Sequence, residues 1–144
     1  MKIKNKPHHI IREMFETYCD ERGEIKKIAQ NVDVLNISSK KNSKRAAHYH
    51  KSSSHLCKLL SGKMLYYERK ALSKDLPIKL EINPGQYFYT GPKIEHLMVF
   101  LEDSIFDCYS FGSRSQNKYE EDLVRIDWDL QDIYNQQMEL NLNG

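Results

Sequence analysis

Short runs of alternating hydrophobic and polar residues dominate the chain from about residue 22 to residue 112. The stretch 63–70, for example, reads KMLYYERK, so that Met64, Tyr66 and Glu68 alternate with a second set of side chains. Successive side chains of a strand point to opposite faces, and this period of two predicts a half-buried strand. Similar runs recur about every 8 to 12 residues, which predicts an all-β sandwich or barrel. They cover residues 24–29, 32–38, 45–50, 55–60, 78–82, 87–89, 94–101 and 105–111.

Turn-forming residues separate these predicted strands. The strongest signal is Asn83-Pro84-Gly85, because proline presets φ and glycine tolerates a positive φ. After the polar stretch 51–54, we expect the strand that begins at His55 to return beside the strand 45–50. The segment 9–19 fits either a short strand or a helical turn, and its periodicity leaves both open.

The pattern changes near the C-terminal end of the sequence. After a short strand at 123–126, apolar residues recur at helical spacing, and Asp127 can cap the N-terminus of a helix. We predict one helix over residues 128–140, packed on the barrel or on a partner subunit. We expect one domain over residues 1–144, with its core at about 22–112 and the C-terminal strand and helix at about 119–142. The helical positions are Leu130, Ile133, Tyr134 and Met138.

Composition narrows the classes of function. The chain of 144 residues carries 22 basic and 20 acidic residues, a net charge of +2, which argues against nucleic acid or an anionic membrane as a partner. Cys19, Cys57 and Cys108 form no C-x-x-C pair, so a disulfide framework is not expected and a reducing compartment fits. The sequence contains no apolar run of signal-peptide or transmembrane type. We therefore expect a cytoplasmic protein that acts on a small molecule.

The stretch 45–62, RAAHYHKSSSHLCKLLSG, concentrates the candidate chemistry. His48 and His50 lie two residues apart, so a strand points both imidazoles to one face. His55 can add a third ligand, and His96 a fourth if the fold delivers it. Neutral imidazole nitrogens bind transition metals, and we predict a divalent ion, with zinc, iron, nickel and manganese left open. The competing interpretation is that the histidines are separate core or surface residues.

The spacing of these residues resembles the two motifs of the cupin superfamily. His48, His50, His55 and Gly62 fit H-x-H-x4-E-x6-G, with His55 in the place of the glutamate. Gly85 and His96 fit the second motif, although Pro92 stands one position late and Phe100 replaces an asparagine. The resemblance implies a cupin double-stranded β-helix, or jelly-roll barrel, here followed by a short C-terminal helix. It also implies a metal held by His48, His50, His55 and His96.

A narrower resemblance is to the dTDP-4-dehydrorhamnose 3,5-epimerases. Arg45-Ala-Ala-His48-Tyr49 is similar to their R-G-x-H-Y stretch, with Ala46 in the place of the glycine. The resemblance implies an epimerase or isomerase that moves a proton next to the carbonyl of a keto-sugar or sugar nucleotide. The catalytic residues it implies are His48, Lys58, His96 and Tyr109, and the residues expected to bind substrate are Arg45, Lys58 and Tyr66.

Two uses of His48 compete under this hypothesis, because an imidazole that ligates a metal cannot abstract a proton. Without a metal, His48 is the base, Lys58 and His96 stabilise the oxyanion and Tyr109 reprotonates the carbon. With a metal, the cation polarises the ketone and Tyr109 or Glu68 handles the proton. The alternatives are another cupin metalloenzyme, such as an oxygenase or a uronate-processing enzyme, and a non-catalytic small-molecule-binding cupin. Cupins of this kind are commonly dimers, so we expect a homodimer.

Overall fold

The structure is a computed structural model that describes residues 17–27, 33–111 and 120–128. It contains β-strands almost throughout, and residues 120–122 are helical. The strands are β1 (Thr17–Asp20), β2 (Gly23–Lys27), β3 (Val34–Ser39), β4 (Lys44–His50), β5 (Ser54–Ser61), β6 (Met64–Lys70), β7 (Ile78–Ile82), β8 (Tyr87–Thr90), β9 (Ile94–Phe100), β10 (Ser104–Phe111) and β11 (Leu123–Arg125).

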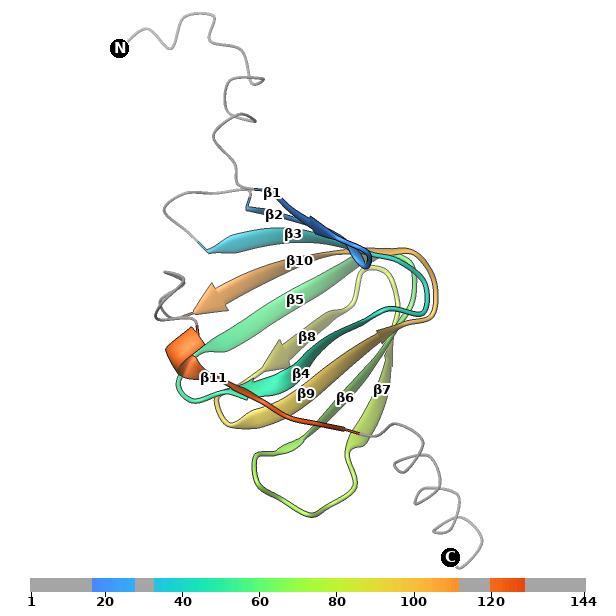
Figure 1. The fold of residues 1–144 in the computed structure, drawn as a ribbon. Helices are drawn as coiled ribbons and strands as arrows, with labels where there is room; N and C mark the ends of the chain where they lie inside the picture. The colour runs from blue at the N-terminus through green and yellow to red at the C-terminus, as the bar shows by residue number, and fades with distance from the viewer. Residues whose placement is uncertain (1–16, 28–32, 112–119, 129–144) are drawn as a thin grey trace, which may run out of the picture.

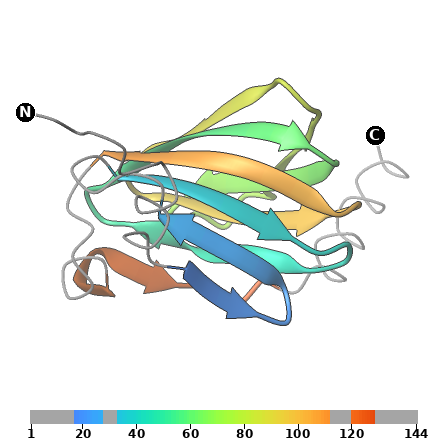
Figure 2. The ribbon, with the colours of Figure 1, turned by 90° about the horizontal axis from the view of Figure 1, so that it is seen from above.

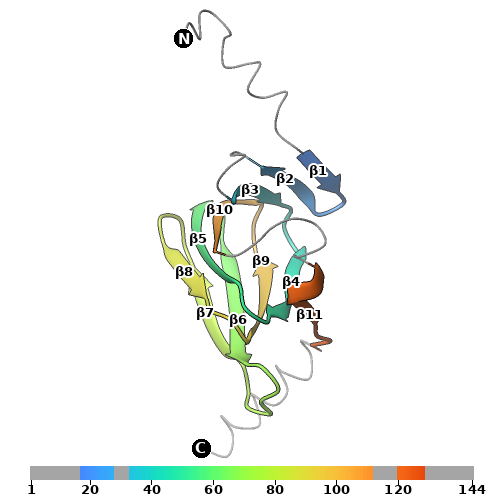
Figure 3. The same ribbon diagram turned by 90° about the vertical axis from the view of Figure 1, so that its left-hand side faces the viewer.

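The strands form two antiparallel sheets that lie face to face (Figures 1 and 2). One sheet has the order β1-β2-β3-β10-β5-β8, and the other has the order β11-β4-β9-β6-β7. Strands that are neighbours in a sheet are often far apart in sequence, because the chain crosses repeatedly from one sheet to the other. Figure 3 shows β10 and β5 of the first sheet beside β9 and β6 of the second. This arrangement is a jelly roll and confirms the all-β prediction.

The core lies between the two sheets and is built by alternate residues of each strand. On β5, Cys57 and Leu59 point inward, while the intervening residues are more exposed. Phe100 on β9 and Phe106 on β10 stack across the core with ring centroids 5.7 Å apart. Burial of one such side chain contributes about 1.5–3 kcal/mol. These apolar contacts hold the two sheets together.

Each predicted run between residues 24 and 111 overlaps a strand, but one predicted pairing is wrong. The strands 45–50 and 55–60 do not return beside each other: β4 pairs with β9 and β11, and β5 pairs with β10 and β8 of the opposite sheet. The polar stretch 51–53 therefore crosses between sheets instead of forming a hairpin. As a result, the histidines of β4 and β5 face each other across the interior.

Two further predictions fall largely outside the described residues. The helix expected over 128–140 lies there except for Trp128, and so does most of the segment 9–19. Cys19 belongs to β1. In the described part of the chain, none of the helical residues forms a segment long and apolar enough to cross a membrane.

Candidate metal and anion site

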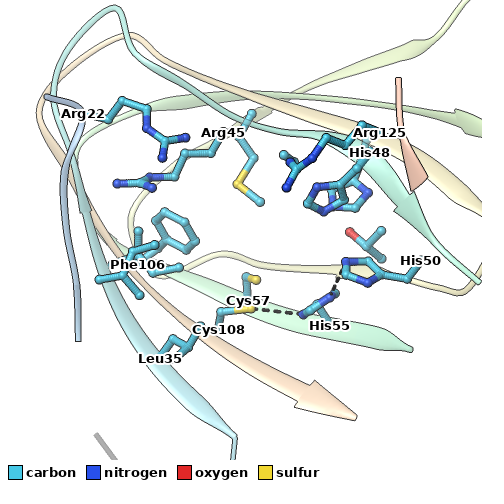
Figure 4. Close-up of a pocket in the computed structure, with 16 residues that line it drawn as sticks. Arg22, Leu35, Arg45, His48, His50, His55, Cys57, Phe106, Cys108 and Arg125 are labelled. Carbon is cyan, nitrogen blue, oxygen red and sulfur yellow. Dashed lines mark hydrogen bonds between the residues drawn. The ribbon is translucent and has the colours of Figure 1, made fainter. Parts of the chain in front are cut away.

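A cavity of about 270 Å³ opens between the two sheets (Figure 4). Its wall combines imidazoles, guanidinium groups, thiols and apolar side chains from both sheets. Because both sheets contribute histidines, the site forms only when the two sheets pack together. The polar residues and cysteines of the wall are Arg22, Arg45, His48, His50, His55, Cys57, Thr90, His96, Cys108 and Arg125.

Three buried histidines form the compact centre of this cavity. Ligand nitrogens of His48, His50 and His96 all lie within 4.8 Å of one another. His48 on β4 is the register partner of His96 on β9, and their ring centroids are 4.7 Å apart. The His48 and His50 rings are 4.8 Å apart. The strand therefore places its H-x-H pair on one face, as predicted.

A β-bulge in β4 aims His48 into the cavity. Ala46 and Ala47 have φ values of 70° and 59°, and the pairing with β9 shifts between Ala46 and His48. In a regular strand, residues three apart point to opposite faces, but the extra residue of a bulge reverses this alternation. Arg45 and His48 are consequently both buried and both line the cavity. A φ near 70° favours glycine, which explains why the motif that resembles this stretch has glycine at position 46.

Burial keeps two of these histidines uncharged. It lowers the pKa of His48 to about 2, with His96, His50 and His55 as further causes. Burial also lowers the pKa of His96 to about 3, although a hydrogen bond between His96 Nδ1 and the Ile94 carbonyl opposes the shift. Both imidazoles are therefore neutral near pH 7. The neutral form is the one that ligates a metal ion.

The fourth predicted ligand, His55, lies beside this group on the opposite sheet. Its Nε2 is 2.9 Å from His50 Nε2. Its Nδ1 is 2.9 Å from Ser110 Oγ and 3.4 Å from Cys108 Sγ. The dashed lines in Figure 4 mark its contacts with His50 and Cys108.

The donor set fits a divalent transition metal. Nitrogen ligands lie about 2.1 Å from such an ion, so two of them are about 3.0–4.2 Å apart around one centre. Ligand nitrogens that all fall within 4.8 Å of one another need only small side-chain adjustments to reach these separations. His48, His50 and His96 would hold the ion, whereas the predicted fourth ligand His55 contacts His50 but lies outside this compact group. Imidazole ligands suit zinc, copper, iron and nickel.

Three arginines line the same cavity, of which Arg22 is ion-paired with Asp20 and Arg125 lies 3.6 Å from a Glu120 carboxylate oxygen. Arg45 is buried, and its Nε and one Nη donate hydrogen bonds to Ser39 Oγ at 2.6 Å and to the Ser38 carbonyl at 3.0 Å. Burial and the nearby Arg22 guanidinium lower the pKa of Arg45. Arg125 on β11 is the register partner of His48. A cavity with a buried guanidinium beside a second one favours an anionic group.

No protein-family model matches the chain, and no curated protein matches it. Several solved structures, however, superpose on the chain. CapF from Staphylococcus aureus, a capsular polysaccharide assembling protein, superposes with a TM-score of 0.70 at 15% identity, over 79% of this chain and 34% of CapF. The QdtA 3,4-ketoisomerase from Thermoanaerobacterium thermosaccharolyticum, in complex with TDP, gives 0.54 at 24% identity, over 77% and 83% of the two chains. The dTDP-4-dehydrorhamnose 3,5-epimerase from Sulfolobus tokodaii gives 0.55 at 20% identity, over 79% and 77%.

The chain has the cupin fold. It spans about a third of the length of CapF, and at these identities the comparison concerns the fold alone. The structure explains why the first cupin motif ends in glycine. Gly62 has a φ of 93°, and a Cβ at this position would lie 2.5 Å from the Asp103 carbonyl oxygen and 2.2 Å from Ser104 Oγ.

The structure brings only some of the sequence-predicted site residues into this cupin cavity. The four histidines and Arg45 line it. Tyr66 is buried behind the wall, where its hydroxyl is 2.5 Å from Thr90 Oγ1 and donates to Glu68 at 3.1 Å. Burial raises the pKa of Tyr66, so the hydroxyl stays protonated.

Lys58 and Tyr109 lie elsewhere. Lys58 alternates with the inward-facing Cys57 and Leu59, and its Nζ lies 5.2 Å from the ring centroid of Tyr87 on the outer face. Tyr109 follows the inward-facing Cys108 and points to the same outer face, on the side away from the histidines. Neither side chain lines the cavity.

Several residues of the site were not predicted from the sequence. Arg22 comes from the turn between β1 and β2, Arg125 from a three-residue strand, and Asp122 from the helical residues before β11. Arg125 and Asp122 belong to no recognisable motif. For Cys57 the sequence contained a weak indication of a place in the site, because Cys57 follows His55 by two residues on the same strand and therefore shares its face.

Proposed function

We propose that this cupin binds a divalent transition metal through His48, His50 and His96 and acts as an isomerase or epimerase on a keto-sugar that carries phosphate, such as a sugar nucleotide. One observation supports this most strongly: a compact group of buried histidines shares a single cavity with three arginines. The histidines supply a metal site, and the arginines supply a site for the anionic part of a substrate.

The structural neighbours support the choice of substrate class. QdtA is a 3,4-ketoisomerase whose structure contains TDP, and the Sulfolobus protein acts on a dTDP-sugar according to its name. Both superpose over more than three quarters of this chain. We therefore extend to this chain the hypothesis of proton transfer next to a sugar carbonyl.

The roles of the chain's own residues follow from their places in the cavity. A buried Arg45, whose hydrogen bonds go to the neutral oxygens of Ser39 and Ser38, retains its charge for a phosphate, and a bound anion would relieve its repulsion with Arg22. Thr90 offers a hydroxyl on the opposite wall. When bound, the metal acts as a Lewis acid that polarises a carbonyl oxygen. His55 lies beside this centre with a ring nitrogen available to hold a proton.

This assignment uses His48 as a ligand and not as the base. It also needs neither Lys58 nor Tyr109, which face away from the cavity. The metal-free mechanism requires both of these side chains next to the substrate. The placement of the three histidines favours the metal-dependent alternative, with His55 in the proton-transfer role expected of Tyr109 or Glu68, since neither of these two lines the cavity.

Two measurements on the full chain test the proposal. Protein purified without chelator should contain about one equivalent of transition metal, and His96→Gln should abolish its retention. With a dTDP-4-keto-sugar in D₂O, the wild type should exchange the hydrogen next to the carbonyl, as followed by NMR, and His96→Gln should not. Tyr87→Phe, on the outer face, serves as the matched control. A sugar nucleotide that binds but keeps its hydrogen would indicate a binding cupin, and absence of stoichiometric metal would contradict the metal site.

The predicted homodimer remains part of this proposal. Exposed aromatic side chains on β8 and β10 give one outer sheet face an apolar character that suits a second subunit, namely Tyr87, Tyr89 and Phe111. Light scattering coupled to size-exclusion chromatography distinguishes a dimer from a monomer.

A further inference from the structure

The Asp122 carboxylate contacts the edge of the histidine group from outside the cavity. It accepts hydrogen bonds from the Ser52 backbone N–H at 2.8 Å and from Ser52 Oγ at 2.6 Å. Its other oxygen lies 3.2 Å from His50 Nδ1. Asp122 is only 10% exposed and His50 only 1% in their side chains, so this contact is shielded from water.

The direction of each hydrogen bond follows from the chemistry of the groups. Both oxygens of Asp122 accept hydrogen bonds from backbone N–H groups, one from Ser52 at 2.8 Å and the other from Ser53 at 3.3 Å, and such donors favour the ionised carboxylate. An ionised carboxylate only accepts, so His50 Nδ1 must donate. In its neutral form, the form that ligates a metal, an imidazole has a single N–H, so this contact places the lone pair of neutral His50 on Nε2.

The same reasoning continues to the next histidine. His50 Nε2, with its lone pair, lies 2.9 Å from His55 Nε2, which therefore donates. His55 Nδ1 then accepts from the Ser110 hydroxyl at 2.9 Å. A hydroxyl can donate or accept, so Ser110 permits either tautomer of His55. A carboxylate permits only one tautomer of His50.

We infer that Asp122 is a positioning residue that fixes neutral His50 in the tautomer with its lone pair on Nε2, the form required of a metal ligand. The inference rests on the proposed function, because it assigns to Asp122 the support of one of the three proposed ligands. Carboxylates that hydrogen-bond a ligating histidine orient the ring and raise its basicity. Asp122 would do so from a segment about 70 residues away in sequence. The neighbouring His55, whose partner is a hydroxyl, can adopt either tautomer.

The first test needs no metal. In the chelator-treated full chain at pH 8, ¹⁵N NMR of the imidazole nitrogens should show His50 with its proton on Nδ1, with His50→Gln used for assignment. In Asp122→Asn, the amide can place an N–H group toward Nδ1, so the Nδ1–H population should fall. A wild-type His50 protonated on Nε2, or a tautomer unchanged by Asp122→Asn, would overturn the inference.

The second test measures affinity for Zn²⁺ alone, in competition with a chromophoric chelator. Asp122→Asn should weaken binding about 10- to 100-fold. Ser52→Ala removes the 2.6 Å hydrogen bond to Asp122 but leaves the contact with His50, so it should change affinity less than about 3-fold. Asp122→Glu should restore part of the affinity.

Two outcomes would count against Asp122 as a positioning residue. Equal losses of Zn²⁺ affinity in Asp122→Asn and Ser52→Ala would show that the affinity depends on the structure of the connection 51–53 and not on the contact with His50. An unchanged affinity in Asp122→Asn would show that Asp122 does not support metal binding. Urea unfolding of each apo variant shows whether the fold is retained. If the wild type binds no Zn²⁺, the proposed function fails, while the NMR result still decides whether Asp122 sets the tautomer of His50.

Discussion

Gly62 provides a quantitative test of the fold, because the structure separates two costs of replacing it. Its φ is 93°, a conformation that costs an L-residue about 1–2 kcal/mol. In addition, a Cβ at position 62 would lie 2.5 Å from the Asp103 carbonyl oxygen and 2.7 Å from Ser104 Cα. These are backbone atoms that cannot rotate away. Forced overpacking of this kind typically costs about 1–3 kcal/mol.

Gly85 is the matched control. It has a similar φ of 87°, but a Cβ there meets nothing within 4 Å. Replacement of glycine by alanine also restricts the unfolded chain, which offsets about 0.4–1 kcal/mol. We therefore expect Gly85→Ala to destabilise the protein by about 1 kcal/mol or less. Gly62→Ala should cost about 2–4 kcal/mol.

Equilibrium unfolding in urea, followed by circular dichroism, measures both variants against the wild type. The informative quantity is the difference between them, because the conformational cost is common to both. That difference should be at least about 1 kcal/mol. Equal losses in the two variants would refute the proposed clash with the connection 103–104, and would leave φ as the sole reason for glycine at this motif position.

Three further predictions concern the site. Below pH 6.5 the unfolded chain protonates His48 and His96 while the folded chain does not, so stability is full above this pH and falls as the pH decreases toward the folded-state pKa values of about 2 and about 3. Urea unfolding of metal-free protein should show a loss of about 2 kcal/mol between pH 6 and pH 5, and His48→Gln/His96→Gln should reduce this slope. Arg45→Gln should weaken TDP binding, measured by calorimetry, about 10- to 100-fold, because hydrogen bonds to charged groups contribute about 1.5–3 kcal/mol. Lys58→Gln, with the same change of charge on the outer face, should have little effect. Lys58→Ala combined with Tyr109→Phe should retain the α-hydrogen exchange, and its loss would restore the metal-free mechanism.

The sequence predicted those features that depend on local periodicity. The strands, the shared face of His48 and His50, and the special role of Gly62 follow from alternation along one strand or from one turn. The pairing of strands does not, since β4 finds its neighbours about 50 and 75 residues away in sequence. The expected hairpin between residues 45–50 and 55–60 failed for this reason. A short polar connection can cross between sheets as readily as it can reverse within one.

The bulge in β4 shows how one local irregularity can decide which residues form a site. With regular alternation, a strand that buries His48 and His50 would expose Arg45, and the cavity would lack its buried guanidinium. Ala46 and Ala47 at positive φ insert the extra residue that brings Arg45 to the histidine side. The register past the bulge also sets His48 opposite His96, which completes the metal group. Lys58 and Tyr109 lie outside the site, because β5 and β10 keep regular alternation at these positions and point both side chains outward. Sequence spacing alone treats all of these residues alike, whereas the bulge makes the arginine and the histidines parts of one site, and the regular alternation of β5 and β10 excludes the lysine and the tyrosine.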